Sequence, residues 1–267
     1  MNIGIIGTGN MGKALIGGLL KTYNQNVSIR AFDLNESAYC DLPSAVTVSH
    51  PQSWFENGNT PDAVLVAVKP TDVATAISFV GSKGSLVSSS LWISIAAGVS
   101  INSIQKLLPD QSRVCRVMPN TPALIAEGIS AFSMNEFCSP EDSSLVNSIF
   151  KACGKVINVP EKMMNAVTGL SGSGPAYVFL FIEAMIEGGV TAGLPYSAAR
   201  ECALQTILGA AKMVLETNQN PAVLKSKVMS PAGTTASGLL ALEQNNFKYS
   251  IISAVLEATK KAEQLGI

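Results

Sequence analysis

Residues 1–12, MNIGIIGTGNMG, decide the fold of the first half of this chain. An apolar run typical of a strand is followed at once by the pattern G-x-G-x-x-G, at the point where a helix should begin. Gly7 permits a tight turn, Gly9 lets the backbone approach a pyrophosphate, and Gly12 allows the helix to pack closely on the strand. The stretch therefore predicts a dinucleotide-binding βαβ unit, with phosphates at the N-terminus of the helix.

Two further features favour this interpretation over a purely structural glycine-rich turn, the alternative in a chain with 22 glycines. A helical run follows the glycines over Met11–Tyr23, and Asp33 ends the next predicted strand, Val27–Phe32. An acid about twenty residues beyond the last glycine is where this fingerprint places a carboxylate for the ribose. We therefore expect the following residues to contact a dinucleotide: Ile6, Gly7, Thr8, Gly9, Asn10, Met11, Gly12 and Asp33.

Later predicted strands extend the sheet and the site. Ala63–Val68 and Leu91–Ile95 are continuous apolar runs, typical of strands that are buried on both faces of a parallel sheet. Ligands of such sheets bind beyond the carboxyl ends of the strands. A strand over Arg113–Met118 ends in a loop stiffened by two prolines, and the small residues after Ile95 leave room for a flat nicotinamide ring. We expect further cofactor contacts from Ala67, Val68, Lys69, Pro70, Ala97 and Asn120.

The isolated reactive side chains indicate neither a metal site nor a disulfide framework. The five cysteines are scattered without a C-x-x-C pair, and the chain has one histidine. That residue, His50, is interpreted as a solvated loop residue in preference to an adenine contact. Tyr177 could donate a proton, but a tyrosine on an apolar helix is more often part of a core. We expect no metal, and mostly buried, reduced thiols.

Composition and charge narrow the classes of partner. The formal net charge is −1 and the sequence holds no basic cluster, so the charge pattern needed to bind nucleic acid is missing. The longest apolar run, Ala176–Ile182, is interrupted at Glu183 and Glu187, so we expect no membrane span. No secretion signal precedes the first strand, which favours a cytoplasmic protein. A hydrophobic share of 47% against 14% charged residues indicates apolar surface buried between subunits of a homo-oligomer.

The pattern changes at about Pro160. Short strands predicted at 129–132 and 156–159 flank a helix over 140–153 and close the first half. Beyond them the chain reads as helices over 176–192, 195–217, 221–229, 235–244 and 247–265. The predicted fold class is α/β. An N-terminal Rossmann-type dinucleotide-binding domain over residues 1–160 is followed by an all-helical C-terminal domain over residues 161–267.

The loop Ser230–Thr235, SPAGTT, lies between two predicted helices and carries the chemistry outside the cofactor site. Pro231 ends the preceding helix, Gly233 permits a turn, and the next helix starts with free N–H groups and two hydroxyls. One interpretation is a carboxylate site without a charged side chain. The other is a plain N-cap, in which Thr234 or Thr235 satisfies the helix end. Spacing alone leaves both open.

Six stretches together resemble the pyrroline-5-carboxylate reductase family over essentially the whole chain. They are IGTGNMGKALIGGLL from Ile6, AVKP from Ala67, SIAAGV from Ser94, MPNTPA from Met118, GLSGSGPAYVF from Gly169 and LKSKVMSPAGTTASGLLALE from Leu224. The last corresponds to the family's specific motif, whereas the first alone fits many reductases. The resemblance implies an oxidoreductase that transfers a hydride from NADPH or NADH to the ring imine carbon of 1-pyrroline-5-carboxylate. The product would be L-proline, in the last step of proline biosynthesis.

The resemblance also implies roles and partners. The Gly7–Gly12 loop, Ala67–Pro70 and Ala97 would bind the cofactor. Ser230, Gly233, Thr234 and Thr235 would hold the substrate carboxylate. Thr235 would also hydrogen-bond the imine nitrogen as the catalytic residue, since a positively charged imine needs orientation by a hydroxyl and no strong acid. Family members form dimers through intertwined helical dimerisation domains, with the substrate loop of one subunit completing its neighbour's site, and often assemble into decamers.

Three departures from the family's pattern bear on these roles. The run Asn218–Pro221, NQNP, replaces a common Gly-Glu-His-Pro, so a role carried by that acid or that His does not transfer to Asn218 or Asn220. Ala232 stands where a second glycine is common, and we expect little harm, because alanine is tolerated unless the residue needs φ > 0. Asp33 would repel a 2′-phosphate and favours NAD over NADP, while Arg30 and Asn35 leave the choice open.

Two rival function classes stay open. A β-hydroxyacid-dehydrogenase-like reductase has the same plan, but its catalytic lysine would lie on the helix after Gly174, where this chain reads YVF at 177–179. A non-enzymatic NAD(P)-binding sensor would use the first domain alone, and the intact Ser230–Thr235 loop weighs against it. Thr235→Ala separates enzyme from sensor, because only the enzyme would lose turnover.

Overall fold

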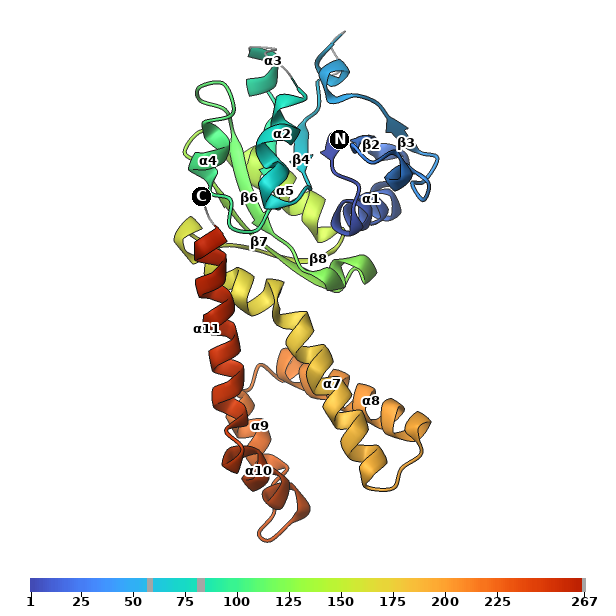
Figure 1. Cartoon of the computed structure of the whole chain (residues 1–267), viewed down its shortest axis with the longest axis vertical. Coiled ribbons are helices and arrows are strands. Elements are labelled where there is room, and N and C mark those ends of the chain that lie inside the picture. Colours follow the sequence, from blue (N-terminus) through green and yellow to red (C-terminus); the bar gives the residue numbers. More distant parts are fainter. Residues whose placement is uncertain (57–59, 81–84, 266–267) are drawn as a thin grey trace. The chain divides into compact units, whose positions relative to one another are not determined.

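The computed structural model describes residues 1–56, 60–80 and 85–265 (Figure 1). They form two compact units. The first comprises Met1–Ser173 and the C-terminal segment from Leu256 on, and the second comprises Gly174–Val255. The first is built on a sheet and the second is helical, so the predicted α/β class with a helical second half is confirmed.

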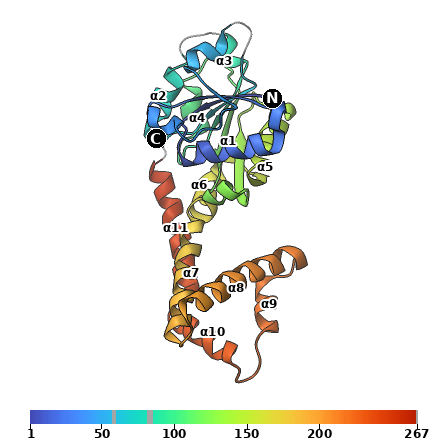
Figure 2. The same ribbon diagram turned by 90° about the vertical axis from the view of Figure 1, so that its right-hand side faces the viewer.

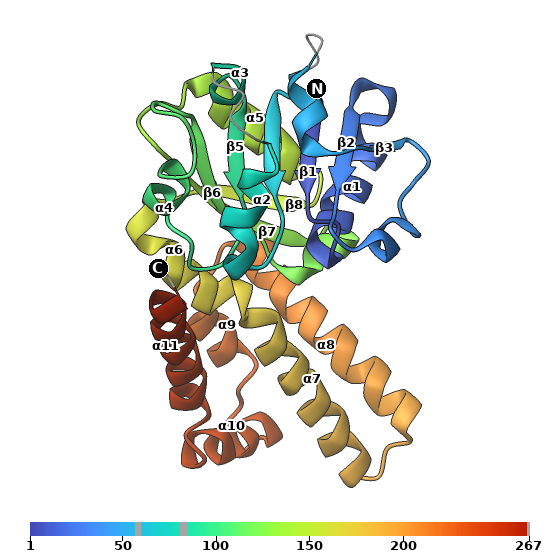
Figure 3. The same ribbon diagram turned by 45° about the horizontal axis from the view of Figure 1, so that its top comes forward.

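An eight-stranded sheet forms the centre of the first unit (Figure 3). Its strands are β1 (Asn2–Ile6), β2 (Ser28–Phe32), β3 (Val46–Val48), β4 (Ala63–Val66), β5 (Leu91–Ser94), β6 (Val114–Met118), β7 (Gly128–Met134) and β8 (Gly154–Asn158). The order is β3-β2-β1-β4-β5-β6-β7-β8, parallel throughout except that β7 runs antiparallel to β6. The order reverses between β1 and β4, which makes their carboxyl ends the expected ligand crevice.

Helices cover both faces of this sheet, with a separate apolar core on each face (Figures 1 and 2). They are α1 (Asn10–Tyr23), α2 (Val73–Ser78), α3 (Ser85–Ser88), α4 (Ile101–Gln105), α5 (Pro140–Lys151) and α6 (Met164–Val167). Ile3 and Ile5 of β1 point into the core under α1 and α5. Ile6 points to the opposite face, into the core formed with Trp54, α2 and α4. Every residue of β4 and β5 is buried, as the continuous apolar runs predict.

Several short elements were not predicted from the sequence. 3-10 helices at Pro51–Phe55, Pro70–Asp72 and Thr121–Ile125 each carry a proline in the first turn and are too short to show helical periodicity. After the turn Pro70–Asp72 the chain is α-helical from Val73 to Ser78.

The second unit is built from the five helices that the sequence predicts there. They are α7 (Gly174–Thr191), α8 (Tyr196–Thr217), α9 (Pro221–Lys227), α10 (Thr234–Gln244) and α11 (Phe247–Leu265), whose last turns count with the first unit. α7 and α8 pack side by side (Figures 1 and 3). The Asn220 Oδ1 accepts the Ala222 N–H at 2.9 Å, so Asn220 is the N-cap of α9.

A π-helical turn over Thr168–Gly172 joins α6 to α7. In this turn the Ser173 N–H donates a hydrogen bond to the Thr168 carbonyl oxygen at 2.9 Å. The continuous helical stretch Glu161–Thr191 is thereby long and apolar enough, by length and composition alone, to cross a membrane. The expectation of no membrane span, which rests on the interrupted run Ala176–Ile182, stays a prediction. Only 6% of the most apolar window of Glu161–Thr191 is buried, and apolar surface left this open needs a covering partner.

Candidate functional site

The glycine loop between β1 and α1 has the geometry that its sequence predicts. Gly7 has φ +100°, in the region that favours glycine, and a β-carbon there would lie 2.5 Å from the Ala67 carbonyl oxygen. A β-carbon on Gly12 would lie 2.2 Å from the Gly7 carbonyl oxygen, so α1 packs directly on the turn. A β-carbon on Gly9 would have no atom within 4 Å. Gly9 therefore leaves open space beside the backbone, where a phosphate could approach.

The N-terminus of α1 suits an anion. Gly9 is the N-cap in extended conformation, and no side chain among the described residues caps the helix. The first N–H groups of an α-helix have no acceptor within the helix, and the first turn of α1 holds no acidic residue. The macrodipole adds partial positive charge at this end. The residues present thus fit a dinucleotide pyrophosphate.

Asp33 holds the glycine loop, and it stands where a ribose-binding carboxylate is expected. Its Oδ2 accepts a hydrogen bond from the Thr8 N–H at 2.7 Å, and its Oδ1 accepts one from the Asn35 N–H at 2.9 Å. Thr8 is fully buried and Asp33 is half-buried. The Tyr39 hydroxyl donates to the Asp33 backbone carbonyl. The acid after β2 therefore fixes the position of the loop after β1.

A cavity of about 180 Å³, here named the Asp33 cavity, opens at the carboxyl ends of β1, β2 and β4. Phe32 and Phe79 line it, with ring centroids 5.3 Å apart. His50 is exposed, as expected, and its ring packs edge-on against Phe32 at 5.0 Å. Aromatic walls next to a carboxylate suit a flat base with its ribose.

The part of this lining that comes from α2 and its ends was not predicted from the sequence. Asp72, Thr75 and Phe79 all line the cavity. They are spaced three and four residues apart, so they share one face of the helix. The signal was present, because the helix that follows β4 starts at the ligand edge of the sheet and its inner face must meet the site.

The candidates after β4 lie beside the glycine loop. The Ala67 N–H donates to the Ile6 carbonyl at 2.7 Å, and Val68 lines the Asp33 cavity. Lys69 is exposed, and Pro70 begins the 3-10 turn before α2. Because β1 and β4 are neighbours in the sheet, the segment after β4 lies beside the glycine loop after β1.

Ala97 and Asn120 follow β5 and β6 at the same edge of the sheet. Ala97 is half-buried. The Asn120 Oδ1 accepts the Ile129 N–H at 2.9 Å, so this carbonyl oxygen holds its own loop to β7. A role for Asn120 in cofactor contact would fall to its amide N–H groups or its backbone.

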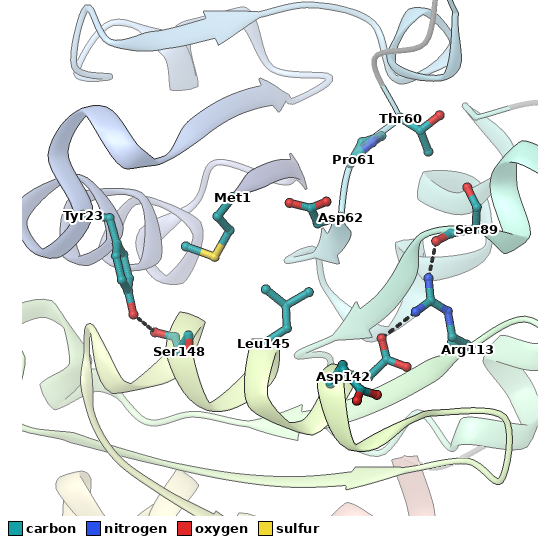
Figure 4. A pocket seen from close by; sticks show the side chains of 11 residues that line it. Met1, Tyr23, Thr60, Pro61, Asp62, Ser89, Arg113, Asp142, Leu145 and Ser148 are labelled. Carbon is teal, nitrogen blue, oxygen red and sulfur yellow. Dashed lines mark hydrogen bonds and ion pairs between the residues drawn. The ribbon is translucent and has the colours of Figure 1, made fainter.

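A wider concavity of about 640 Å³ lies at the opposite, amino ends of the strands (Figure 4). Several of its polar groups already have hydrogen-bond partners. Arg113 Nη1 donates to Asp142 Oδ1 at 2.6 Å, and the Tyr23 hydroxyl donates to the Ser148 carbonyl at 2.9 Å. Asp62 Oδ2 accepts the Asn2 N–H at 2.7 Å. The ligand edge of an open parallel sheet is the other one, so this hollow is not the cofactor site.

The predicted substrate loop lies in the second unit, at the start of α10. Gly233 is the N-cap, and its N–H donates to the Ser230 carbonyl at 3.0 Å. Thr234 and Thr235 are the first two helical residues, and neither side chain caps the helix within the described part of the chain. The interpretation of either threonine as the N-cap is therefore wrong. The first-turn N–H groups and both hydroxyls are left for a ligand.

The expectation that Ala232 does little harm is also wrong, because its φ is +57°. An L-residue in this left-handed region places its β-carbon against the backbone, at a cost of about 1–2 kcal/mol. A glycine at this position would avoid that cost. The loop of this chain is therefore strained beside its candidate substrate residues.

Among the remaining reactive side chains, Cys115 and Cys153 are buried and Cys138 is half-buried, whereas Cys40 and Cys202 are exposed, so the thiols are less buried than expected. The Tyr177 hydroxyl donates to the Ala254 carbonyl at 3.3 Å, which agrees with a packing role. Burial raises the pKa of the Cys138 thiol, and likewise that of Cys153, to about 11. Among residues 1–56, 60–80 and 85–265, no group of three His, Cys, Asp or Glu side chains could hold a metal ion.

Comparison with known proteins gives these features a family. A family model described as pyrroline-5-carboxylate reductase dimerisation matches residues 161–265, and one described as NADP oxidoreductase coenzyme F420-dependent matches residues 2–98. The pyrroline-5-carboxylate reductase of a Synechocystis species is 41% identical over 269 residues, covering 100% of this chain and 98% of that protein. This chain belongs to the pyrroline-5-carboxylate reductase family.

Solved structures agree with this membership. The Plasmodium falciparum pyrroline carboxylate reductase with NADP bound has a TM-score of 0.89 at 32% identity, covering 100% of this chain and 98% of that one. The Coxiella burnetii pyrroline-5-carboxylate reductase has a TM-score of 0.88 at 34% identity, with the same coverage. The resemblance inferred from the six stretches is confirmed. This reductase is an NAD(P)H-dependent oxidoreductase, and its helical half carries the family's dimerisation region.

Proposed function

We propose that this reductase converts 1-pyrroline-5-carboxylate to L-proline, the last step of proline biosynthesis. The observation that carries the proposal is the Ser230–Thr235 loop, which presents an uncapped N-terminus of α10 flanked by hydroxyl groups. Such a helix end binds a carboxylate without a charged side chain. A neutral loop also suits a substrate whose ring nitrogen is positively charged, because a lysine or arginine there would repel it.

The substrate would be held by the loop's own groups. Ser230, Gly233 and Thr234 would bind its carboxylate through N–H and hydroxyl donors. The Thr235 hydroxyl would hydrogen-bond the ring nitrogen and orient the imine carbon. When bound, a reduced nicotinamide supplies the hydride that this carbon accepts. The carbon–nitrogen double bond then becomes a single bond and the nitrogen keeps its proton, which gives proline.

The cofactor would lie along the ligand edge of the sheet. The pyrophosphate would meet the N–H groups at the start of α1, the adenosine would enter the Asp33 cavity, and the nicotinamide would reach the small residues after β5. The residues proposed to bind it are Ile6, Gly7, Thr8, Gly9, Asn10, Met11, Gly12, Asp33, Ala67, Val68, Lys69, Pro70, Ala97 and Asn120.

We further propose that residues 1–160 form the dinucleotide-binding domain and residues 161–267 the dimerisation and substrate-binding domain, of which 266 and 267 lie outside the described residues. The match of the dimerisation model to residues 161–265 supports this. So does the exposure of large apolar side chains on α7, with Phe179 at 62% and Leu180 at 66%. A second copy would cover this surface, as the composition predicts.

A homodimer interface accounts for the long apolar helix without a bilayer. We propose that the protein is cytoplasmic and acts away from membranes and nucleic acid, and that the dimers assemble further into a decamer. Size measurement in solution tests the assembly: a species of ten chains supports it, a species of two chains supports the dimer but contradicts the decamer, and a stable monomer contradicts both.

The rival classes are less well supported by the second unit. A β-hydroxyacid-dehydrogenase-like reductase needs a lysine near the start of α7. This chain has Tyr177 there, and its hydroxyl donates a hydrogen bond to the Ala254 carbonyl. A sensor that uses the first unit alone has no use for an uncapped, strained Ser230–Thr235 loop.

Thr235→Ala tests the proposal, with Thr235→Ser as the matched control that restores the hydroxyl. We expect kcat to fall by about a hundredfold or more in Thr235→Ala and to recover largely in Thr235→Ser. The dissociation constant for the reduced cofactor should not change in either variant. Unchanged turnover in Thr235→Ala would contradict the assigned role.

A further inference from the structure

The Asp33 cavity is acidic. Its ionisable lining side chains are both carboxylates, Asp33 at the end of β2 and Asp72 before α2. The rest of its described lining is apolar or neutral. Any part of a cofactor that enters this cavity therefore meets negative charge.

The Asp33 carboxylate is fixed in place. Its two oxygens accept the Thr8 and Asn35 N–H groups at 2.7 and 2.9 Å. Moving it away from the cavity would break both hydrogen bonds and release the glycine loop. The charge at this position cannot be relieved by a simple rotation of the side chain.

The basic side chains closest in sequence are directed elsewhere. Arg30 Nη1 donates to the Trp54 carbonyl at 3.1 Å and Nη2 to Asn2 Oδ1 at 3.2 Å, toward the amino end of β1. Lys13 Nζ pairs with Asp41 at 3.1 Å. Lys69 follows β4 at the ligand edge but does not line the cavity. Arg30 is thereby removed as a ligand for a 2′-phosphate.

The segment after β2 adds negative charge and no positive charge. Asn35 Oδ1 accepts the Ser37 N–H and hydroxyl at 3.2 and 2.8 Å, which caps the 3-10 turn Glu36–Tyr39. The first residue of that turn, Glu36, is a further exposed carboxylate. A 2′-phosphate needs positive charge, and residues 34–40 contain no basic side chain.

From these contacts we infer that this reductase selects NADH over NADPH. The inference rests on the proposed function, and it assigns Asp33 and Asp72 as the residues that set the choice. A carboxylate accepts hydrogen bonds from the free 2′- and 3′-hydroxyls of the NADH ribose. The NADPH phosphate brings about −1.5 to −2 charges to the same place and is repelled.

Direct binding tests the inference without turnover. We expect the dissociation constant of the purified protein for NADH, from quenching of tryptophan fluorescence, to be about tenfold or more below that for NADPH. AMP should displace NADH better than AMP carrying a 2′-phosphate. Because salt screens the repulsion, the NADH-to-NADPH ratio should narrow as ionic strength rises.

Three variants locate the effect. Asp33→Asn should make the dissociation constants for NADH and NADPH nearly equal. Asp72→Asn leaves the contact between Asp33 and Thr8 intact and should reduce the difference between the two constants in part. Asp110→Asn is the control, because Asp110 is exposed before the amino end of β6 and should change nothing. If Asp33→Asn fails to fold, two measurements still test the inference: the ratio of the NADH and NADPH dissociation constants in the wild-type protein, and the change of that ratio in Asp72→Asn.

The outcomes separate this inference from the proposed function. NADPH binding as tightly as NADH to the wild-type protein would overturn the inference and leave the proposed reaction standing. Binding of neither nucleotide would overturn the proposed cofactor site itself. If Asp110→Asn reduced the difference between the NADH and NADPH dissociation constants as much as Asp33→Asn and Asp72→Asn do, the assignment of the choice to Asp33 and Asp72 would be contradicted.

Discussion

Gly233 lies so close to Ser230 that a β-carbon at position 233 would sit 2.3 Å from the Ser230 hydroxyl oxygen. Gly233→Ala must therefore move the Ser230 side chain, which we propose as a ligand of the substrate carboxylate. We expect KM for 1-pyrroline-5-carboxylate to rise about tenfold or more, since hydrogen bonds to a charged group are worth about 1.5–3 kcal/mol. Cofactor affinity should not change.

A double-mutant cycle with Ser230→Ala checks this explanation. If Gly233→Ala acts through the Ser230 hydroxyl, the double variant should have the same KM as Ser230→Ala alone. Simple addition of the two effects would show that Gly233 acts by another route.

The matched glycines of α1 give a second prediction. A β-carbon on Gly12 meets the Gly7 carbonyl oxygen at 2.2 Å, whereas one on Gly17 meets nothing within 4 Å. Gly12→Ala should displace the helix from the loop and weaken NADH binding by about tenfold or more. Gly17→Ala should leave binding unchanged and stabilise the protein by about 0.5–1 kcal/mol. Similar NADH affinities for both variants would contradict the proposed role of the loop.

Ala232 gives a prediction about stability. Ala232→Gly removes the steric cost of φ +57° but adds freedom to the unfolded chain, so we expect a net gain of up to about 1 kcal/mol. Ala236→Gly, the same change at the third residue of α10, should instead cost about 0.5–1 kcal/mol. Urea unfolding measures both. A loss of stability in Ala232→Gly would show that the left-handed conformation is not the source of strain.

Alkaline pH should destabilise the protein through its buried thiols. Burial raises the pKa of Cys138 and of Cys153 from 9.0 to about 11, so the native state holds these protons more tightly than the unfolded state. Their contribution is complete below the unfolded pKa and is lost as pH rises through the folded value. The free energy of unfolding should fall between about pH 9 and 11, and less steeply in Cys153→Ala than in Cys40→Ala. Cys40 is exposed and serves as the control.

The sequence predicted those parts of the fold that depend on local pattern. The strands that carry apolar runs and the helices of the second unit follow from apolar periodicity and from the residues that begin and end helices. The glycine loop was also predictable, because each glycine of the motif meets one local steric requirement.

The rest depends on contacts between residues far apart in the chain. The Asn120 and Ile129 pair and the turning of Arg30 toward Trp54 arise only after the strands have assembled. The φ of Ala232 is set by closure of its loop, since alanine itself avoids that region. The π-turn before α7 was hidden by glycines that argue against a helix.

The most direct test of the proposed function is oxidation of reduced nucleotide by the purified protein with 1-pyrroline-5-carboxylate, with NADH and NADPH supplied separately. We predict that NADH is oxidised in step with the appearance of L-proline, one molecule for one, and faster than NADPH at low concentrations of nucleotide. Oxidation of neither nucleotide by a folded protein that still binds NADH would contradict the proposed reaction.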